Sequence, residues 1–170
     1  MPRQPLWKIG TRAQAMEILV ESRDRIIALV NELDDSQMKP PTKLGGGQWS
    51  VKDLLGHLAG VEEQAVALAK GEKPGFHFAS NEADIERKKS WSIKRIRQDR
   101  DKQRADLLDA IDTMDDSRWV EKIQTRTGRS ALALVLGKLL VGGHYGLFAH
   151  DLAHIQDLKR SVKELKGSAK

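Results

Sequence analysis

Hydrophobic residues recur along this chain every three or four positions, which is the period of one face of an α-helix. The first such segment runs from Thr11 to Leu33. Thr11 and Gln14 form a capping-box pattern, so we expect this helix to begin at Thr11. Almost no segment alternates with a period of two, so strands are not expected.

The second periodic segment follows Gly45–Gly47. Ser50 is the expected N-cap of this helix, and Asp53 in the first turn interacts favourably with the helix dipole. Gly71 and Pro74 end the helix. One face carries Leu54, His57, Leu58, Val61, Ala65 and Leu68. A histidine therefore occupies a position where the pattern predicts an aliphatic side chain.

Two further helical regions complete the pattern. One covers Ile93 to Met114, preceded by a helical turn near Asn81, and its sparse apolar positions predict a helix that is wet on most of its surface. The last begins at Ser130, runs to about Leu165 and is divided near Gly142–Gly143. Four main helices joined by moderate loops predict an all-α fold, a four-helix bundle.

Length and composition fit a soluble globular protein. The 170 residues are 39% hydrophobic and 31% charged, which predicts a single domain over residues 1–170 with its core between about 11 and 166. No apolar run has membrane-spanning length, and no secretory signal is recognised. The chain has no cysteine, which excludes disulfides, thiolate metal sites and cysteine nucleophiles. We expect a cytoplasmic protein, with which the lack of cysteine is compatible.

Positive charge is concentrated between Glu86 and Arg104. This segment holds nine Lys or Arg against three acidic residues, a net charge of +6, whereas the whole chain carries +5. Such a segment is typical of a solvated helix face, although it can also contact phosphate or an acidic ligand. Only Trp91 is interleaved for base stacking, so a nucleic-acid partner is not expected.

Three histidines are the candidate functional residues. His150 and His154 are four residues apart, so on a helix their imidazoles lie one turn apart and can chelate one metal ion. His57 lies on the apolar face of the second helix, where a buried imidazole needs a polar partner or a metal. Three neutral imidazoles leave a coordination position open, as catalytic sites do. Zinc, nickel and iron(II) all accept imidazole, and the sequence does not choose between them.

Two motifs in these segments are similar to those of a known superfamily. Residues 48–59, Gln-Trp-Ser-Val-Lys-Asp-Leu-Leu-Gly-His-Leu-Ala, resemble the second-helix motif of the DinB-like (DinB/YfiT-like) superfamily, and residues 150–155 resemble its last-helix His-x-x-x-His motif. The resemblance implies a four-helix bundle, often a homodimer, with one divalent metal held by His57, His150 and His154. It also implies a low-molecular-weight thiol as a cosubstrate in some relatives.

These observations favour a metal-dependent enzyme acting on a small molecule. The resemblance is compatible with a thiol-dependent S-transferase or isomerase and with a hydrolase. A non-catalytic protein that sequesters a metal or a small molecule is the alternative. No general base is assigned, because Glu62 and Glu63, just beyond His57, are more typical of surface carboxylates.

Overall fold

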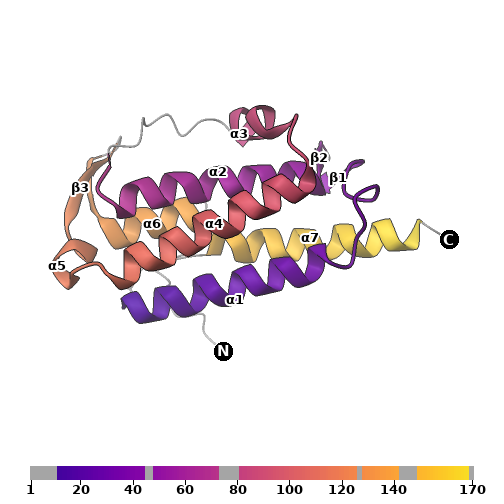
Figure 1. Ribbon diagram of the computed structural model, residues 1–170. Coiled ribbons are helices and arrows are strands. Elements are labelled where there is room, and N and C mark those ends of the chain that lie inside the picture. Colours follow the sequence, from indigo (N-terminus) through magenta and orange to yellow (C-terminus); the bar gives the residue numbers. More distant parts are fainter. Residues whose placement is uncertain (1–10, 45–47, 73–80, 126–127, 142–148, 169–170) are drawn as a thin grey trace.

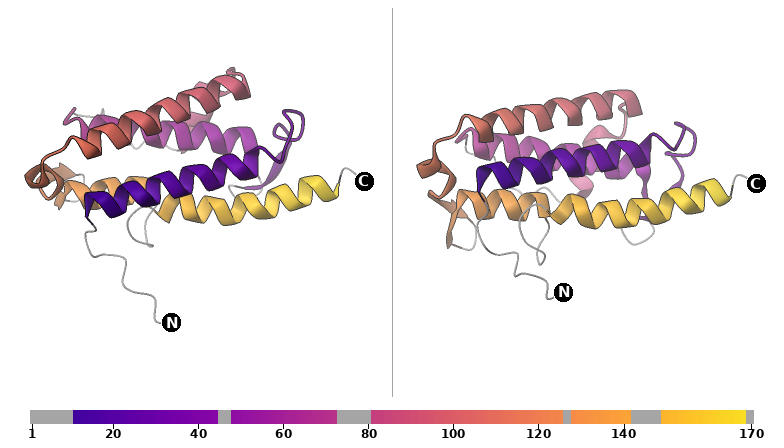
Figure 2. Two further views of the ribbon diagram at one scale, coloured as in Figure 1. Left: turned by 60° about the horizontal axis from the view of Figure 1, so that its bottom comes forward. Right: turned by 90° about the horizontal axis from the view of Figure 1, so that it is seen from below.

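Four helical rods lie side by side in the computed structural model (Figure 1). Three of them are α1 (Arg12–Val30), α2 (Val51–Ala69) and α4 (Ile93–Asp112). The fourth consists of α6 (Leu132–Val141) and α7 (Ala149–Gly167), which follow one another end to end in both views of Figure 2. The structure describes residues 11–44, 48–72, 81–125, 128–141 and 149–168. The four-helix bundle predicted from the sequence is confirmed.

The helix starts depend on local capping, as the sequence indicates. The Thr11 hydroxyl accepts the Gln14 N–H at 3.2 Å, and the Gln14 side chain accepts the Thr11 N–H at 3.0 Å. Ser50 and Asp53 form the same reciprocal pair at the start of α2, at 3.0 and 2.9 Å. Gly71 follows α2 with a φ of 75°, a conformation that glycine adopts without strain. The capping predictions are confirmed.

Two short hairpins show that the expectation of no strands was wrong. β1 (Pro41–Leu44) pairs with β2 (Trp49–Ser50), and β3 (Lys122–Thr125) pairs with β4 (Gly128–Ala131), both antiparallel. Strands of two to four residues are too short for a period-two pattern to stand out. Ser130 therefore lies in β4 and does not open the last helical region, since α6 begins at Leu132. Two short helices, α3 (Asn81–Lys88) and α5 (Asp116–Trp119), complete the described elements.

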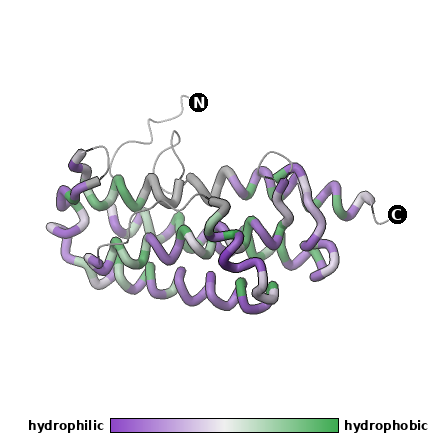
Figure 3. The backbone as a smooth tube through the Cα atoms, turned by 90° about the horizontal axis from the view of Figure 1, so that it is seen from above, coloured by the Kyte–Doolittle hydropathy of each residue, from purple (hydrophilic) through white to green (hydrophobic). Residues whose placement is uncertain are grey.

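The core consists of two apolar clusters, one toward each end of the bundle. In Figure 3 hydrophobic and hydrophilic segments follow one another along the helices, as expected when one face of each helix is directed into the bundle. The first cluster includes Leu19, Ala65, Leu107, Trp119, Leu132 and Leu136. The second includes Ile26, Leu54, Leu58, Ile96, Ile155 and Leu158. The buried Leu132 and Leu136 account for the apolar stretch at the start of α6 within one chain.

Buried charged and polar side chains separate the two clusters on three of the rods. Ser22 lies between Leu19 and Ile26 on α1, and Glu62 lies between Leu58 and Ala65 on α2. On α4, Arg100 and Arg104 take the corresponding positions and are 2% and 0% exposed. The sequence predicted that most of the surface of this helix is exposed to solvent, and it did not identify these two arginines as buried. No local sequence pattern distinguishes a buried arginine from an exposed one.

Arg104 is held by groups from two neighbouring helices. Its guanidinium donates to the Glu62 carboxylate at 2.8 Å, to the Leu19 carbonyl and to the Ser22 hydroxyl at 3.3 Å. The Glu62 side chain is 2% exposed, so this ion pair lies inside the bundle. The buried ion pair and its additional hydrogen bonds thus connect α4 to both α1 and α2.

The short helix α3 packs against α2 over two glycines. A Cβ on Gly60 would lie 2.2 Å from the Asp84 carboxylate carbon, whereas a Cβ on Gly56 would lie 3.6 Å from Lys88 Cβ. Lys88 is buried and donates to Glu63 at 2.6 Å and to Asp99 at 2.8 Å. Glycine at position 60 therefore allows the close approach of α3 to α2.

No helix within the described ranges is both long and apolar enough to span a membrane. Several features expected from the sequence, including Gly45–Gly47, Pro74 and Gly142–Gly143, lie outside the described residues.

Candidate metal site

Two of the three predicted ligands, from α2 and α7, lie next to each other. His57 is only 2% exposed, and His154 is half-buried near the beginning of α7. The centroids of their imidazole rings are 5.4 Å apart, and the ring planes are inclined at 75°. The two residues are far apart in the sequence, so the packing of α7 into the bundle brings them together.

The third predicted ligand, His150, lies in the first turn of α7. This places it one turn before His154 on the same helix. The side chains of residues 149–153, including the His150 ring, lie outside the described part of the structure. Among the side chains that the structure does describe, no group of three or more potential metal ligands occurs. The three-histidine site therefore stays a prediction.

The indole of Trp49 packs against both imidazoles. Its ring centroid is 5.2 Å from that of His57 and 6.5 Å from that of His154. Trp49 lies in β2, directly before Ser50, the N-cap of α2. Trp49 belongs to the segment that resembles the second-helix motif of the superfamily. The sequence alone did not show that its ring would contact both histidines.

The spacing of the two imidazoles fits a shared divalent ion. With metal–nitrogen bonds of about 2.0–2.1 Å and a tetrahedral angle, the centroids of two imidazoles on one zinc ion lie ~5 Å apart. The observed separation is 5.4 Å. The donor type is also suitable, because imidazole binds zinc, nickel and iron(II). The residues present therefore fit a metal, although an edge-to-face ring pair has a similar spacing.

The two glutamates beyond His57 are both in ion pairs. Glu62 accepts from the buried Arg104, so its interpretation as a surface carboxylate was wrong. Glu63 accepts from Arg87 at 2.5 Å and from Lys88 at 2.6 Å. Each carboxylate is thus already engaged by a cation of the fold. The structure therefore does not favour either one as a general base.

The basic segment on α3 and α4 is not one continuous exposed surface. Lys88, Arg100 and Arg104 are buried, which removes three of its nine cationic residues from solvent. Arg87, Lys89 and Lys102 form ion pairs with Asp84, Glu86 and Asp106. Three of the nine cations are thus buried, and three others are paired with acidic neighbours at the surface.

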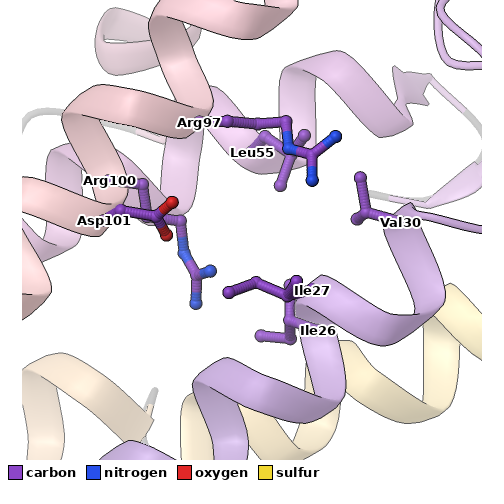
Figure 4. Close-up of a pocket in the computed structure, with 7 residues that line it drawn as sticks. All are labelled: Ile26, Ile27, Val30, Leu55, Arg97, Arg100 and Asp101. Atoms are coloured by element: carbon purple, nitrogen blue, oxygen red, sulfur yellow. The ribbon is translucent and has the colours of Figure 1, made fainter.

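A separate pocket lies between α1 and α4 and contains none of the candidate ligands. Its lining residues are Ile26, Ile27, Val30, Leu55, Arg97, Arg100 and Asp101. Figure 4 shows Arg97 and Arg100 extending from α4 toward the aliphatic side chains of α1. Its empty space of about 230 Å³ includes open solvent, so the pocket is not an enclosed cavity. The Arg97 guanidinium also donates to the Asn31 side chain at 2.5 Å, so this arginine has a partner within the fold and links α4 to the end of α1.

Solved structures with the same fold have little sequence in common with this chain. The mycothiol-dependent maleylpyruvate isomerase superposes with a TM-score of 0.69 at 13% identity, over 88% of this chain and 61% of the isomerase. An uncharacterised protein from Escherichia coli UTI89 superposes with a TM-score of 0.73 at 13% identity, over 91% of this chain and 94% of that protein. This chain therefore spans less than two thirds of the isomerase.

Among curated proteins, none matches this sequence. A family model does match residues 19–141, which is more than half of the chain. The matched segment includes α2 with His57 and ends with α6, so it does not reach His150 and His154. The chain belongs to the family of the mycothiol maleylpyruvate isomerase N-terminal domain, within the DinB-like superfamily that its motifs resemble.

Proposed function

We propose that this protein is a divalent-metal-dependent enzyme that uses a low-molecular-weight thiol in an isomerase or S-transferase reaction. The observation that carries the proposal is the 5.4 Å separation of the His57 and His154 rings. Family membership adds the thiol, because a related structure is a mycothiol-dependent isomerase. In this proposal His150 provides the third ligand from one turn earlier on α7.

The bound metal would lower the pKa of a coordinated thiol or water, which supplies a nucleophile near neutral pH. The chain's own residues would hold and orient the site. His57 comes from the buried face of α2, which excludes water on that side. Glu62 and Glu63 remain in their ion pairs and take no part in proton transfer.

The proposal is tested by turnover with defined metals and thiols. Purified protein is loaded separately with Zn²⁺, Ni²⁺ or Fe²⁺ and supplied with mycothiol, bacillithiol or glutathione. Electrophiles serve as candidate substrates for S-transfer, and a cis-configured dicarboxylate serves as a candidate substrate for isomerisation. We expect turnover that requires both a metal and a thiol and that is lost in His57→Ala and His150→Ala. His144→Ala removes another imidazole from the same part of the chain and is expected to keep the activity.

Three other results would each contradict part of the proposal. Equal turnover after complete metal removal would exclude the metal-dependent mechanism. Metal-dependent hydrolysis without a thiol would support a hydrolase instead. Stoichiometric binding of an electrophile without turnover would identify a sequestering protein.

The assembly state is part of the same proposal. We propose a homodimer on the basis of the superfamily resemblance alone, since burial within one chain already explains the apolar residues Leu132, Val135 and Leu136 of α6. Sedimentation equilibrium would test this directly, and a monomeric mass at micromolar concentration would contradict it.

A further inference from the structure

The tryptophan that precedes α2 contacts both described histidines of the candidate site. The Trp49 ring lies 5.2 Å from the His57 ring and 6.5 Å from the His154 ring, within the 4.5–7 Å usual for aromatic pairs. The three rings come from β2, α2 and α7. One indole thus spans two ligands that reach the site from separate helices.

Local contacts that do not involve the histidines fix the backbone of Trp49. Its carbonyl accepts the Thr42 hydroxyl at 2.9 Å, and Trp49 pairs with Leu44 across the β1–β2 hairpin. The Thr42 hydroxyl in turn accepts the Leu44 N–H at 3.1 Å. Ser50, the next residue, caps α2. The hairpin and the cap together hold the indole at the beginning of α2, about two turns before His57.

Tryptophan can position ligands but does not itself bind a metal through its neutral indole. Its only polar group is an N–H donor, and its large ring is rigid apart from two torsions. An imidazole has a broad torsion about its ring bond, so an unpacked histidine must be ordered when it binds a metal. A ring packed against two imidazoles restricts both of them before the metal arrives and excludes water from that side of the site.

We infer that Trp49 is a positioning residue of the metal site, which orients the His57 and His154 rings together and increases the metal affinity. This inference rests on the proposed function, because it assigns to Trp49 a role toward the metal that the histidines would hold. It predicts that metal affinity depends on an aromatic ring at position 49 even though that ring supplies no ligand.

The test measures Zn²⁺ affinity in the full chain by competition with a chromogenic chelator. Trp49→Ala is expected to weaken binding about 10- to 100-fold, the range typical of groups that support metal ligands. Trp49→Phe retains an aromatic ring and is expected to restore most of the affinity. Trp91→Phe is the matched control, because the contacts described for the Trp91 ring are with the cationic groups of Lys88 and Arg95, at 4.4 and 3.9 Å. We expect it to bind Zn²⁺ as the wild type does.

Fluorescence provides a second readout that needs no enzyme activity. Ni²⁺ or Co²⁺ bound to the histidines is expected to quench the adjacent indole. The quenched part of the emission should therefore disappear in Trp49→Phe and persist in Trp91→Phe. A purely structural role would lower the melting temperature of Trp49→Ala without changing the affinity of the protein that remains folded.

The outcomes separate this inference from the proposed function. If Trp49→Ala is folded and binds Zn²⁺ as tightly as the wild type, while His57→Ala does not bind, the inference is wrong and the metal site stands. If Trp49→Ala does not fold, quenching that is undiminished in Trp49→Phe would overturn the inference, because the bound metal would then not lie beside the indole of Trp49. If the wild type binds no more Zn²⁺ than His57→Ala does, both the inference and the proposed function are wrong.

Discussion

Two of the regions in which the bundle buries polar side chains differ in the groups that surround those side chains. On the α1–α4 side, Arg104 is bound by the Glu62 carboxylate and by groups of α1. On the α2–α7 side, His57 is packed by His154 and Trp49. The first region matches opposite charges with each other, whereas the second gathers two groups that bind the same kind of ligand.

This difference teaches that burial of a polar residue does not by itself indicate a functional site. A guanidinium paired with a carboxylate contributes to the packing of the helices and has no need of a ligand. Two imidazoles from separate helices bind the same kind of ligand, and in the proposed function they share one metal ion. The following predictions test whether the first region serves stability and the second serves binding.

The largest effect is expected when the buried ion pair loses one partner. Arg104→Met leaves the Glu62 carboxylate buried without its cation, which should lower the free energy of unfolding by about 3–5 kcal/mol. Urea denaturation followed by circular dichroism measures it. The double variant with Glu62→Leu should recover much of the loss, because it removes the buried charge. A loss below about 1 kcal/mol in Arg104→Met would mean that the pair does not hold the helices together.

A smaller effect is expected on the face of α2 that packs against α3. Gly60→Ala forces the short Asp84 side chain away from its position, which should lower the free energy of unfolding by about 1–3 kcal/mol. Gly56→Ala is the matched control, since its added Cβ makes an ordinary contact with Lys88. Both variants gain the same helix propensity of about 1 kcal/mol. Equal unfolding free energies for the two variants would contradict the steric explanation.

The smallest change in stability is expected at His57, although it lies in the core. His57→Leu places an aliphatic side chain where the apolar pattern of α2 predicts one, so the metal-free protein should keep its unfolding free energy within about 1 kcal/mol. Urea denaturation in the presence of a chelator measures this. A loss as large as that of Arg104→Met would show that the imidazole is part of the packing and would remove the contrast between the two regions.

The sequence predicted those features that depend on neighbours a few residues away. The caps at Thr11 and Ser50 and the apolar face of α2 follow from local spacing, so the helices and the burial of His57 could be expected. The short hairpins could not, because their strands are too brief to show a period. Burial of Arg104 depends on Glu62, 42 residues earlier, and no local pattern marks that pair.

Only part of the candidate site could likewise be predicted from the sequence. Histidine spacing on the last helix and the position of His57 on an apolar face suggested ligands that could share an ion. Contact between the His57 and His154 rings and the packing of Trp49 against both depend on the association of β2, α2 and α7. Such contacts between distant segments require the folded structure.

The metal content of purified protein tests the central claim most directly. The wild type, His57→Ala, His154→Ala and the control His144→Ala are equilibrated with Zn²⁺, passed through a desalting column and measured by elemental analysis. We expect about one ion per chain in the wild type and in His144→Ala, and almost none in the other two variants. Equal metal content in all four proteins, or none in the wild type, would contradict the claim that His57 and His154 bind one metal.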